Sequence, residues 1–242
     1  MRLQDKVAVV TGSAAGIGLA IAERFVREGA IVYGCDIAFD DAGTSADGIR
    51  TRSLDVARLE DWTRLAAEIS DAHGAADVLV NNAGLVRSYE SITDVDVDVY
   101  HSVININQHG LFYGLRTMIP LMKGRQRGAS IVNISSIQGL VAVPDMAPYQ
   151  ASKGAVTMMS RNAALTYARD GIRVNSVHPG LIKTPMTDSQ DQEFSQTLID
   201  ETPLGRAGRA DEVANLVLFL ASDEASYITG GQYVIDGGIT AK

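Results

Sequence analysis

The sequence of 242 residues contains a single cysteine, Cys35, and few aromatic residues, which make up 6% of the chain. One cysteine excludes a disulfide within the chain and cannot by itself build a metal site. Basic residues are also in the minority, because 21 Lys and Arg stand against 29 Asp and Glu, for a net charge of -8. A negative chain without a basic cluster argues against binding to nucleic acid or to an anionic membrane, and it favours a small neutral or weakly charged partner.

Long apolar runs are missing as well, since none approaches the roughly 18 residues that a membrane-spanning helix needs. The first residues, MRLQDKVAVVTG, lead directly into a strand pattern and lack the basic, apolar and small-residue order of a secretory signal. No Pro- or Ser-rich linker, charge block or repeat divides the chain, of which 46% is hydrophobic. The sequence therefore predicts a single globular domain over residues 1–242, no membrane partner and a reducing, cytoplasmic location.

A glycine-rich turn follows the first strand pattern. Residues 7–11 form the short, continuously apolar run expected of a strand buried on both faces of a parallel sheet. The sequence TGSAAGIG at 11–18 comes next and opens an amphipathic helix pattern. Gly12 permits a tight turn, Gly16 lets the backbone approach a pyrophosphate, and Gly18 lets the helix lie close to the sheet. Because a helix N-terminus attracts phosphate, this order of strand, turn and helix predicts a dinucleotide site.

An acidic residue ends the second predicted strand, Ile31 to Cys35. Asp36 lies at about the distance beyond the glycine turn where a carboxylate accepts hydrogen bonds from an adenosine ribose. A carboxylate there repels a 2'-phosphate, and no arginine follows directly to offset it. The sequence therefore favours NAD over NADP, while a solvated aspartate at a strand end is the simpler alternative.

The rest of the chain alternates between strand and helix patterns. Residues 37–50 are rich in Gly, Asp, Ser and Ala and predict a loop or a short helix, and residues 184–203 are polar with scattered apolar positions, which suits a lid over a substrate. Further strands are expected at 51–54, 77–80, 129–134, 172–177 and 232–235, and further helices at 59–72, 98–122, 148–169 and 211–220. About seven strands alternating with about six helices predict an α/β fold, a doubly wound Rossmann-type parallel sheet with helices on both faces.

Tyr149 and Lys153 are four residues apart in a helix that Pro148 is suited to begin. This spacing puts the phenol and the ammonium on one helical face. A tyrosine with a pKa of about 10 needs its pKa lowered by roughly three units to act as a base near neutrality, and one charge about 4 Å away contributes roughly that much. The alternative is a partly buried ring beside the apolar stem of a lysine. The pair alone does not decide between them.

Small residues and amides follow the strand expected at 77–80, in the sequence Asn81-Asn82-Ala83-Gly84. They suit a ligand crevice, since ligands of open α/β sheets bind at the carboxyl ends of the strands. Consecutive asparagines are also common in turns, so this motif by itself does not indicate a ligand site and has to be considered together with the other motifs. The motifs of the whole chain are, in order, TGSAAGIG at 11–18, Asp36, LDV at 54–56, NNAG at 81–84, NIN at 105–107, Ser136 thirteen residues before Tyr149, YQASK at 149–153, and PG at 179–180 followed by Thr184.

In this order and near these spacings, the motifs resemble those of the short-chain dehydrogenase/reductase family, in its single-domain form, from end to end. The resemblance implies that Tyr149 is the acid/base, that Ser136 hydrogen-bonds the substrate oxygen, and that Lys153 lowers the tyrosine pKa and holds the nicotinamide ribose. It implies that Asn107 interrupts its helix to hold a water of a proton relay. His178 is an alternative base that we disfavour, because the tyrosine already has that task.

The resemblance also implies a nicotinamide cofactor, in which Asp55 meets the adenine and Thr184 the carboxamide. The expected cofactor-binding residues are Gly12, Ala15, Gly16, Ile17, Gly18, Asp36, Asp55, Val56, Asn82, Ala83, Gly84, Tyr149, Lys153, Pro179, Gly180, Ile182 and Thr184. No cluster of His, Cys and carboxylate residues in the sequence offers a metal site. The resemblance further suggests a homotetramer, with the helix after Tyr149 and the C-terminal strand at its interfaces.

The expected substrate walls are mostly apolar and predict a compact hydrophobic secondary alcohol or ketone, of a cyclic, aryl-alkyl or steroid-like kind. The expected substrate contacts are Ser136, Gln138, Val143, Met146, Tyr149 and Met186, with Leu140, Val141, Leu181 and Phe194 as further wall residues. The alternatives are an NADPH-dependent ketoreductase such as a 3-oxoacyl-carrier-protein reductase, a sugar or polyol dehydrogenase, and a nucleotide-binding regulator without catalysis.

Overall fold

The computed structural model describes residues 1–40, 43–45, 47–87, 89–125, 128–188 and 192–241. The strands are β1 (Val7–Thr11), β2 (Ile31–Asp36), β3 (Gly43–Thr44), β4 (Arg50–Ser53), β5 (Val78–Asn81), β6 (Ala129–Ile134), β7 (Ile172–Pro179), β8 (Ile182–Lys183), β9 (Gly208–Arg209) and β10 (Gln232–Ile235). The helices are α1 (Gly16–Arg27), α2 (Leu59–His73), α3 (Val97–Ile104), α4 (Gly110–Met122), α5 (Ala147–Tyr167), α6 (Pro185–Asp188), α7 (Gln192–Glu201) and α8 (Ala210–Ala221).

Across these residues, eight strands form one sheet in the order β10-β7-β6-β5-β1-β2-β4-β3. Each neighbouring pair is parallel except β3 and β4, which are antiparallel. The chain leaves the central β1 first toward β2 and β4, and then crosses back to β5 on its other side. The predicted doubly wound parallel sheet is confirmed, and the strand order reverses at β1, where open α/β sheets bind their ligands.

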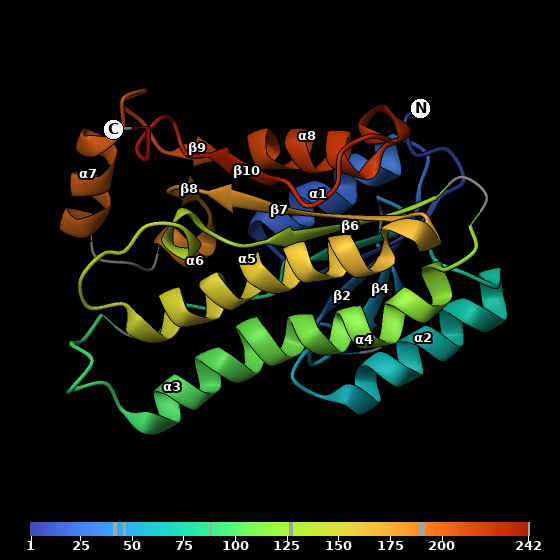
Figure 1. Cartoon of the computed structure of the whole chain (residues 1–242), viewed down its shortest axis with the longest axis horizontal. Coiled ribbons are helices and arrows are strands. Elements are labelled where there is room, and N and C mark those ends of the chain that lie inside the picture. Colours follow the sequence, from blue (N-terminus) through green and yellow to red (C-terminus); the bar gives the residue numbers. More distant parts are fainter. Residues whose placement is uncertain (41–42, 46, 88, 126–127, 189–191, 242) are drawn as a thin grey trace.

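Alternate residues of β1 belong to two separate cores, one on each face of the sheet. Val7 and Val9 pack with buried side chains of α2, α4 and α5, whereas Ala8 and Val10 pack with those of α1 and α8. Figure 1 shows the same division, with α2, α4 and α5 along one side of the sheet and α1 and α8 along the other. A strand covered on both faces needs apolar residues at every position, which explains the unbroken apolar run in the sequence.

The carboxyl ends of the strands lie together at one end of the molecule. In Figure 1 the arrowheads of β6, β7 and β10 point toward the end where α6 and α7 are found. A two-stranded pairing of β8 with β9 lies beside them. The elements that follow β7 therefore stand next to the ligand-binding edge of the sheet.

The segment 37–50 forms no helix in its described part, residues 41–42 and 46 lying outside the described range. It forms a turn and the two-residue strand β3, and the Ser45 side chain accepts a hydrogen bond from the Ile49 amide at 3.2 Å. Gly48 has a φ of 84°, a conformation that ends rather than extends a helix. The short helix that we considered for this segment is therefore wrong for the described residues.

The segment 184–203 is mostly helical rather than a loop, with residues 189–191 outside the described range. It contains α6 and α7, and Phe194 and Leu198 stand four residues apart on α7. This spacing gives the helix an apolar face in an otherwise polar sequence. In the described part of the chain, no helix combines the length and the apolar character needed to cross a membrane.

Candidate active site

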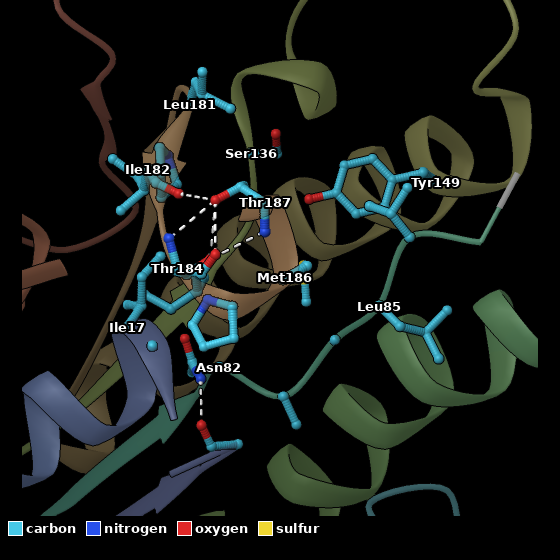
Figure 2. Close-up of a pocket in the computed structure, with 18 of the residues that line it drawn as sticks. Ile17, Asn82, Leu85, Ser136, Tyr149, Leu181, Ile182, Thr184, Met186 and Thr187 are labelled. Carbon is cyan, nitrogen blue, oxygen red and sulfur yellow. Dashed lines mark hydrogen bonds between the residues drawn. The ribbon is translucent and has the colours of Figure 1, made fainter. Parts of the chain in front are cut away.

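A cavity of about 470 Å³ lies at the carboxyl ends of the strands around β1. Its walls come from the glycine turn, from the segments that follow β2, β5 and β6, from the start of α5, and from the region after β7 (Figure 2). The structure brings most of the predicted site residues to this one cavity, namely Gly12, Ala15, Gly16, Ile17, Asp36, Asn82, Ala83, Gly84, Ser136, Gln138, Met146, Tyr149, Lys153, Pro179, Gly180, Ile182, Thr184 and Met186.

The glycine turn has no room for a side chain at Gly12 or Gly18. Gly12 and Gly16 have φ values of 67° and 58°, which L residues rarely adopt. A Cβ atom on Gly12 would lie 2.9 Å from the Cα of Ala83, and one on Gly18 would lie 2.0 Å from the Gly12 carbonyl oxygen. Ala15, at the N-cap of α1, makes no side-chain capping bond, so the first amides of the helix are open to a bound anion. This cradle fits the pyrophosphate of a dinucleotide.

Asp36 lies beside the glycine turn at the end of β2. One carboxylate oxygen accepts a hydrogen bond of 3.0 Å from the Ala14 amide, and the other accepts one of 3.0 Å from the Ala38 amide. These two bonds fix the carboxylate at the cavity wall and leave it able to accept further bonds. The position fits the hydroxyl groups of an adenosine ribose.

Asn82 ties the two sides of the crevice together. Its side-chain amide donates to the carbonyl oxygens of Thr11 at 2.9 Å and Gly12 at 3.2 Å. The Thr11 hydroxyl in turn accepts hydrogen bonds from the Asn82 and Ala83 amides, both at 3.0 Å. The end of β5 is thereby held against the end of β1.

Asn107 lies in a π-helical turn, Asn105–His109, between α3 and α4. The helix predicted at 98–122 is interrupted there, as expected. The Asn107 side chain is 2% exposed and accepts a 2.8 Å bond from the Leu85 amide while donating to the Leu85 carbonyl and to the Ser152 hydroxyl. Asn107 therefore fixes the course of the segment that follows β5.

Ser136 follows β6 and caps a 3-10 turn, Ile137–Gly139. Its hydroxyl oxygen accepts a bond of 3.2 Å from the Gln138 amide, which leaves the O–H group as a donor toward the cavity. Helix α5 begins at Ala147 with Pro148 in its first turn, so Tyr149 and Lys153 share one face. Figure 2 shows the Tyr149 hydroxyl entering the cavity toward Ser136.

Burial dominates the ionisation of both α5 residues. It raises the pKa of Tyr149 to about 12, against a lowering by the Ser136 hydroxyl, and the neighbouring Tyr89 adds to the rise. It lowers the pKa of Lys153 to about 8. The Lys153 nitrogen donates a 2.9 Å bond to the Ile134 carbonyl oxygen. The pKa of Tyr149 is therefore raised rather than lowered as expected, with desolvation by burial as the largest cause.

His178 is fully buried in β7 and lies outside the cavity. Its two ring nitrogens bond the Ser136 carbonyl oxygen and the Ser176 hydroxyl, each at 2.9 Å. Burial lowers its pKa, while the hydrogen bond to Ser136 raises it and the Lys153 charge lowers it. With both nitrogens engaged, His178 is not placed to accept a substrate proton.

Several predicted residues do not line the cavity. Val143 is not among the residues that line the cavity; its carbonyl accepts a bond from the Gln150 side chain, and the following turn places Asp145 at a φ of 59°. The Asp55 carboxylate accepts a hydrogen bond from the Ala57 amide at the start of a turn, and the Val56 side chain packs against Gly110. Neither residue lines the cavity. Leu140 and Val141, two further expected walls, are 39% and 43% exposed outside it. Gly18 and Asn107 also lie outside the cavity wall, but Gly18 packs against Gly12 and Asn107 bonds Leu85, and both of these partners line the cavity.

Sequence reasoning missed several wall residues, among them Leu85, Val86, Tyr89, Thr187 and Leu198. Leu85 and Val86 directly follow the NNAG motif, and this adjacency is the one signal that could have found them. Tyr89 packs edge-on against Phe194 with ring centroids 5.6 Å apart, and both rings line the cavity. Among the residues that the structure covers, no group of three His, Cys, Asp or Glu side chains is arranged to hold a metal ion.

Comparison with known proteins finds relatives that match the chain over its full length. A family model described as enoyl-(acyl carrier protein) reductase matches residues 12–240. The chain is 42% identical over 254 residues to an NADP-dependent (R)-specific alcohol dehydrogenase of Lentilactobacillus kefiri, covering 100% of this chain and 99% of the relative. It is also 42% identical over 244 residues to a 3-alpha-(or 20-beta)-hydroxysteroid dehydrogenase of Mycobacterium tuberculosis, covering 99% and 91% of the two.

Among solved structures, the chain superposes on the ligand-free aldohexose dehydrogenase of Thermoplasma acidophilum with a TM-score of 0.89. The two are 36% identical, and the match covers 99% of this chain and 96% of the other. Sequence and structure comparisons therefore agree on one fold and one family over the whole length.

Proposed function

The chain belongs to the short-chain dehydrogenase/reductase family, and from this premise we propose that it is an NAD-dependent enzyme that interconverts a secondary alcohol and a ketone. The observation that carries the proposal is the joint presence of Ser136, Tyr149 and Lys153 in one cavity with Asp36. A nicotinamide cofactor, when bound, supplies the acceptor or donor of a hydride. The chain's own residues supply the binding cradle and the movement of the proton.

In the oxidation direction, the Tyr149 oxygen takes the hydroxyl proton of the alcohol as the hydride leaves the carbinol carbon. The Ser136 O–H group donates to the substrate oxygen and stabilises the negative charge that develops on it. Lys153, on the same helical face, supports the proton transfer and would hold the nicotinamide ribose. In the reverse direction Tyr149 protonates the ketone oxygen.

The choice of NAD rests on Asp36. Its carboxylate is fixed by the Ala14 and Ala38 amides at the cavity wall, where it repels a 2'-phosphate. The Lentilactobacillus relative carries NADP in its name, so relationship alone does not decide the matter. Initial rates with NAD and NADP at equal concentration test the proposal, and a higher rate with NADP would overturn it.

The substrate end of the cavity is mostly apolar, which supports a compact hydrophobic substrate. The apolar wall residues there include Val86, Tyr89, Met146, Leu181, Met186, Phe194 and Leu198. Burying a ring or a chain of carbon atoms against such walls is favourable, whereas a polyol would leave its hydroxyl groups without partners. We therefore expect oxidation of cyclopentanol, 1-phenylethanol or a hydroxysteroid, followed by NADH absorbance. A strong preference for sorbitol or an aldohexose would contradict this substrate class.

A carrier-protein reductase is the second candidate, favoured by the description of the matching family model. An acidic carrier protein would need a basic docking patch, and a chain with a net charge of -8 is poorly suited to supply one. Assay of a 3-oxoacyl thioester with NADPH separates the two functions.

We further propose that the enzyme is cytoplasmic and forms a homotetramer. We also propose that residues 184–203 form a lid over the substrate. Met158 and Leu165 on α5 are 60% and 85% exposed, and a Cβ atom on Gly154 of the same helix would meet no atom within 4 Å. Such a face suits close packing against a second chain. Light scattering that gives the mass of a monomer would contradict the assembly.

A further inference from the structure

His178 connects the strand β7 to the backbone of Ser136. A carbonyl oxygen only accepts hydrogen bonds, so the nitrogen Nδ1, 2.9 Å from the Ser136 oxygen, carries the ring hydrogen. In the neutral ring, Nε2 then accepts from the Ser176 hydroxyl at 2.9 Å. The imidazole is 0% exposed, and a buried ring with both nitrogens bonded has one orientation.

We propose that His178 is a positioning residue for Ser136: its Nδ1–H group holds the Ser136 carbonyl so that the Ser136 hydroxyl meets the substrate oxygen. The proposal rests on the proposed function for the role of Ser136. It adds that a residue outside the cavity sets the geometry of the reaction.

The Ser136 carbonyl has both of its acceptor positions filled. One is taken by His178, and the other by the Gly139 amide at 3.0 Å, which closes the 3-10 turn. Ser136 itself is extended, with φ and ψ of -165° and 160°, so its hydroxyl projects from a backbone fixed at the carbonyl. Release of the carbonyl therefore frees the turn and the hydroxyl together.

The same turn is held from its other side by α5. A Cβ atom on Gly139 would lie 2.7 Å from the Lys153 carbonyl oxygen and 2.7 Å from the Ser135 hydroxyl, so the turn packs directly on that helix. The turn thus lies between His178 on β7 and Lys153 on α5. Because α5 also carries Tyr149, His178 sets the position of the Ser136 hydroxyl relative to the phenol.

Two polar substitutions separate positioning from general packing. In His178→Asn the side-chain amide can donate from about the position of Nδ1, whereas in His178→Gln the longer side chain carries its donor near Nε2. A displacement of about 1 Å at a reacting group lowers turnover by about 100-fold. We expect kcat for 1-phenylethanol with NAD to fall about 10-fold to 100-fold in the Gln variant and to stay within about 3-fold of wild type in the Asn variant. Equal losses in both variants would overturn the proposal.

The effect should disappear when Ser136 can no longer act. In the Ser136→Ala background, adding His178→Gln is expected to change kcat by less than about 2-fold, since residues that act through one group are not additive. Affinity for NADH, measured by fluorescence, is expected to stay unchanged in every variant. A full loss from His178→Gln in the Ser136→Ala background would show a general structural role and reject the proposal.

Crystallography of the two variants gives a result that does not depend on turnover. The Ser136 carbonyl and hydroxyl are expected to move in His178→Gln and to keep their places in His178→Asn. If the wild-type chain oxidises no alcohol of the panel, the proposed function fails, while these crystals still decide the positioning by His178. An unmoved Ser136 in the Gln variant would overturn it.

Discussion

The side-chain nitrogen of Lys153 lies 5.5 Å from the centroid of the Tyr149 ring and 2.9 Å from the Ile134 carbonyl oxygen that it bonds. Burial moves the two pKa values in opposite directions, to about 8 for Lys153 and to about 12 for Tyr149. Each shift favours the neutral form, because a charge in this position loses its hydration. The pair therefore reduces the stability of the fold whenever either member is charged.

The first prediction concerns Lys153 and stability. Its pKa of about 8 lies below the ordinary value of 10.5, so the folded chain binds fewer protons than the unfolded chain between these values. Its contribution to the free energy of unfolding therefore rises as the pH increases from about 8 to 10.5, by about 3 kcal/mol. We expect Lys153→Met to be more stable than wild type at pH 7, by up to that amount, and the difference to close at high pH.

Urea unfolding of both proteins across this pH range measures the difference. Lys183→Met is the matched control, because Lys183 is exposed on β8 and its substitution is expected to leave the pH dependence unchanged. A difference between Lys153→Met and wild type that stays constant with pH would contradict the assignment of the shift to Lys153.

The second prediction concerns Tyr149 and the direction of the reaction. Alcohol oxidation requires the phenolate, and below a pKa of about 12 its fraction grows about tenfold for each pH unit. The kcat/KM for oxidation is therefore expected to rise from pH 7 to 10, while that for ketone reduction stays nearly constant, because the phenol remains protonated well below its pKa. Tyr149→Phe is expected to lower both by about 100-fold to 10,000-fold with NADH binding retained. Tyr227→Phe, at a fully exposed tyrosine, serves as the control, and wild-type-like turnover by Tyr149→Phe would remove the tyrosine from the mechanism.

The parts of the fold that sequence reasoning predicted are those that neighbouring residues determine. Strand β1 begins and ends where its apolar run does, because a strand covered on both faces needs such a run, and the bounds predicted for β6 and β10 are also the observed ones. The glycine turn was predictable for a similar reason, since the conformations of Gly12 and Gly16 exclude other residues. The interruption at Asn107, by contrast, was expected from resemblance alone.

The rest of the site depends on contacts between distant segments. Leu85 was missed as a wall residue because its place is set by the Asn107 side chain, 22 residues further along the chain. The raised pKa of Tyr149 was missed because burial in the cavity cannot be read from the spacing to Lys153. The role that we propose for His178 likewise depends on a bond to Ser136 that spans 42 positions. No local pattern encodes these distances.

The third prediction concerns Asp36 and the choice of cofactor. Asp36→Asn removes the charge but retains a side-chain oxygen, and Ala38→Arg adds a cation at a residue of the cavity wall. Since loss of about 1.4 kcal/mol of repulsion changes a ratio tenfold, we expect the double variant to shift the NADP to NAD ratio of kcat/KM by at least about tenfold toward NADP. Asp40→Asn, at an exposed carboxylate outside the cavity wall, is the control. An unchanged ratio in the double variant would remove Asp36 from cofactor selection.

The last prediction concerns the size of the substrate. The rings of Tyr89 and Phe194 pack edge-on with centroids 5.6 Å apart and come from two segments that border the substrate end of the cavity. Removing either ring enlarges that end, at a loss of stability of about 0.5–1.5 kcal/mol for the pair beyond the buried area. An enlarged cavity has room for a large substrate to make van der Waals contacts with its walls, whereas a small substrate loses contacts with the side chain that was removed.

We therefore expect Phe194→Ala and Tyr89→Ala to raise the kcat/KM for a hydroxysteroid relative to cyclopentanol, by about tenfold in each case, since one or two methylene groups in an apolar pocket discriminate by about 10-fold to 200-fold. Tyr227→Ala, at a fully exposed ring elsewhere on the surface, is expected to leave the ratio unchanged. Equal losses for both alcohols would mean that the ring pair supports the fold without limiting substrate size, whereas a shift toward cyclopentanol would place the substrate at another part of the wall.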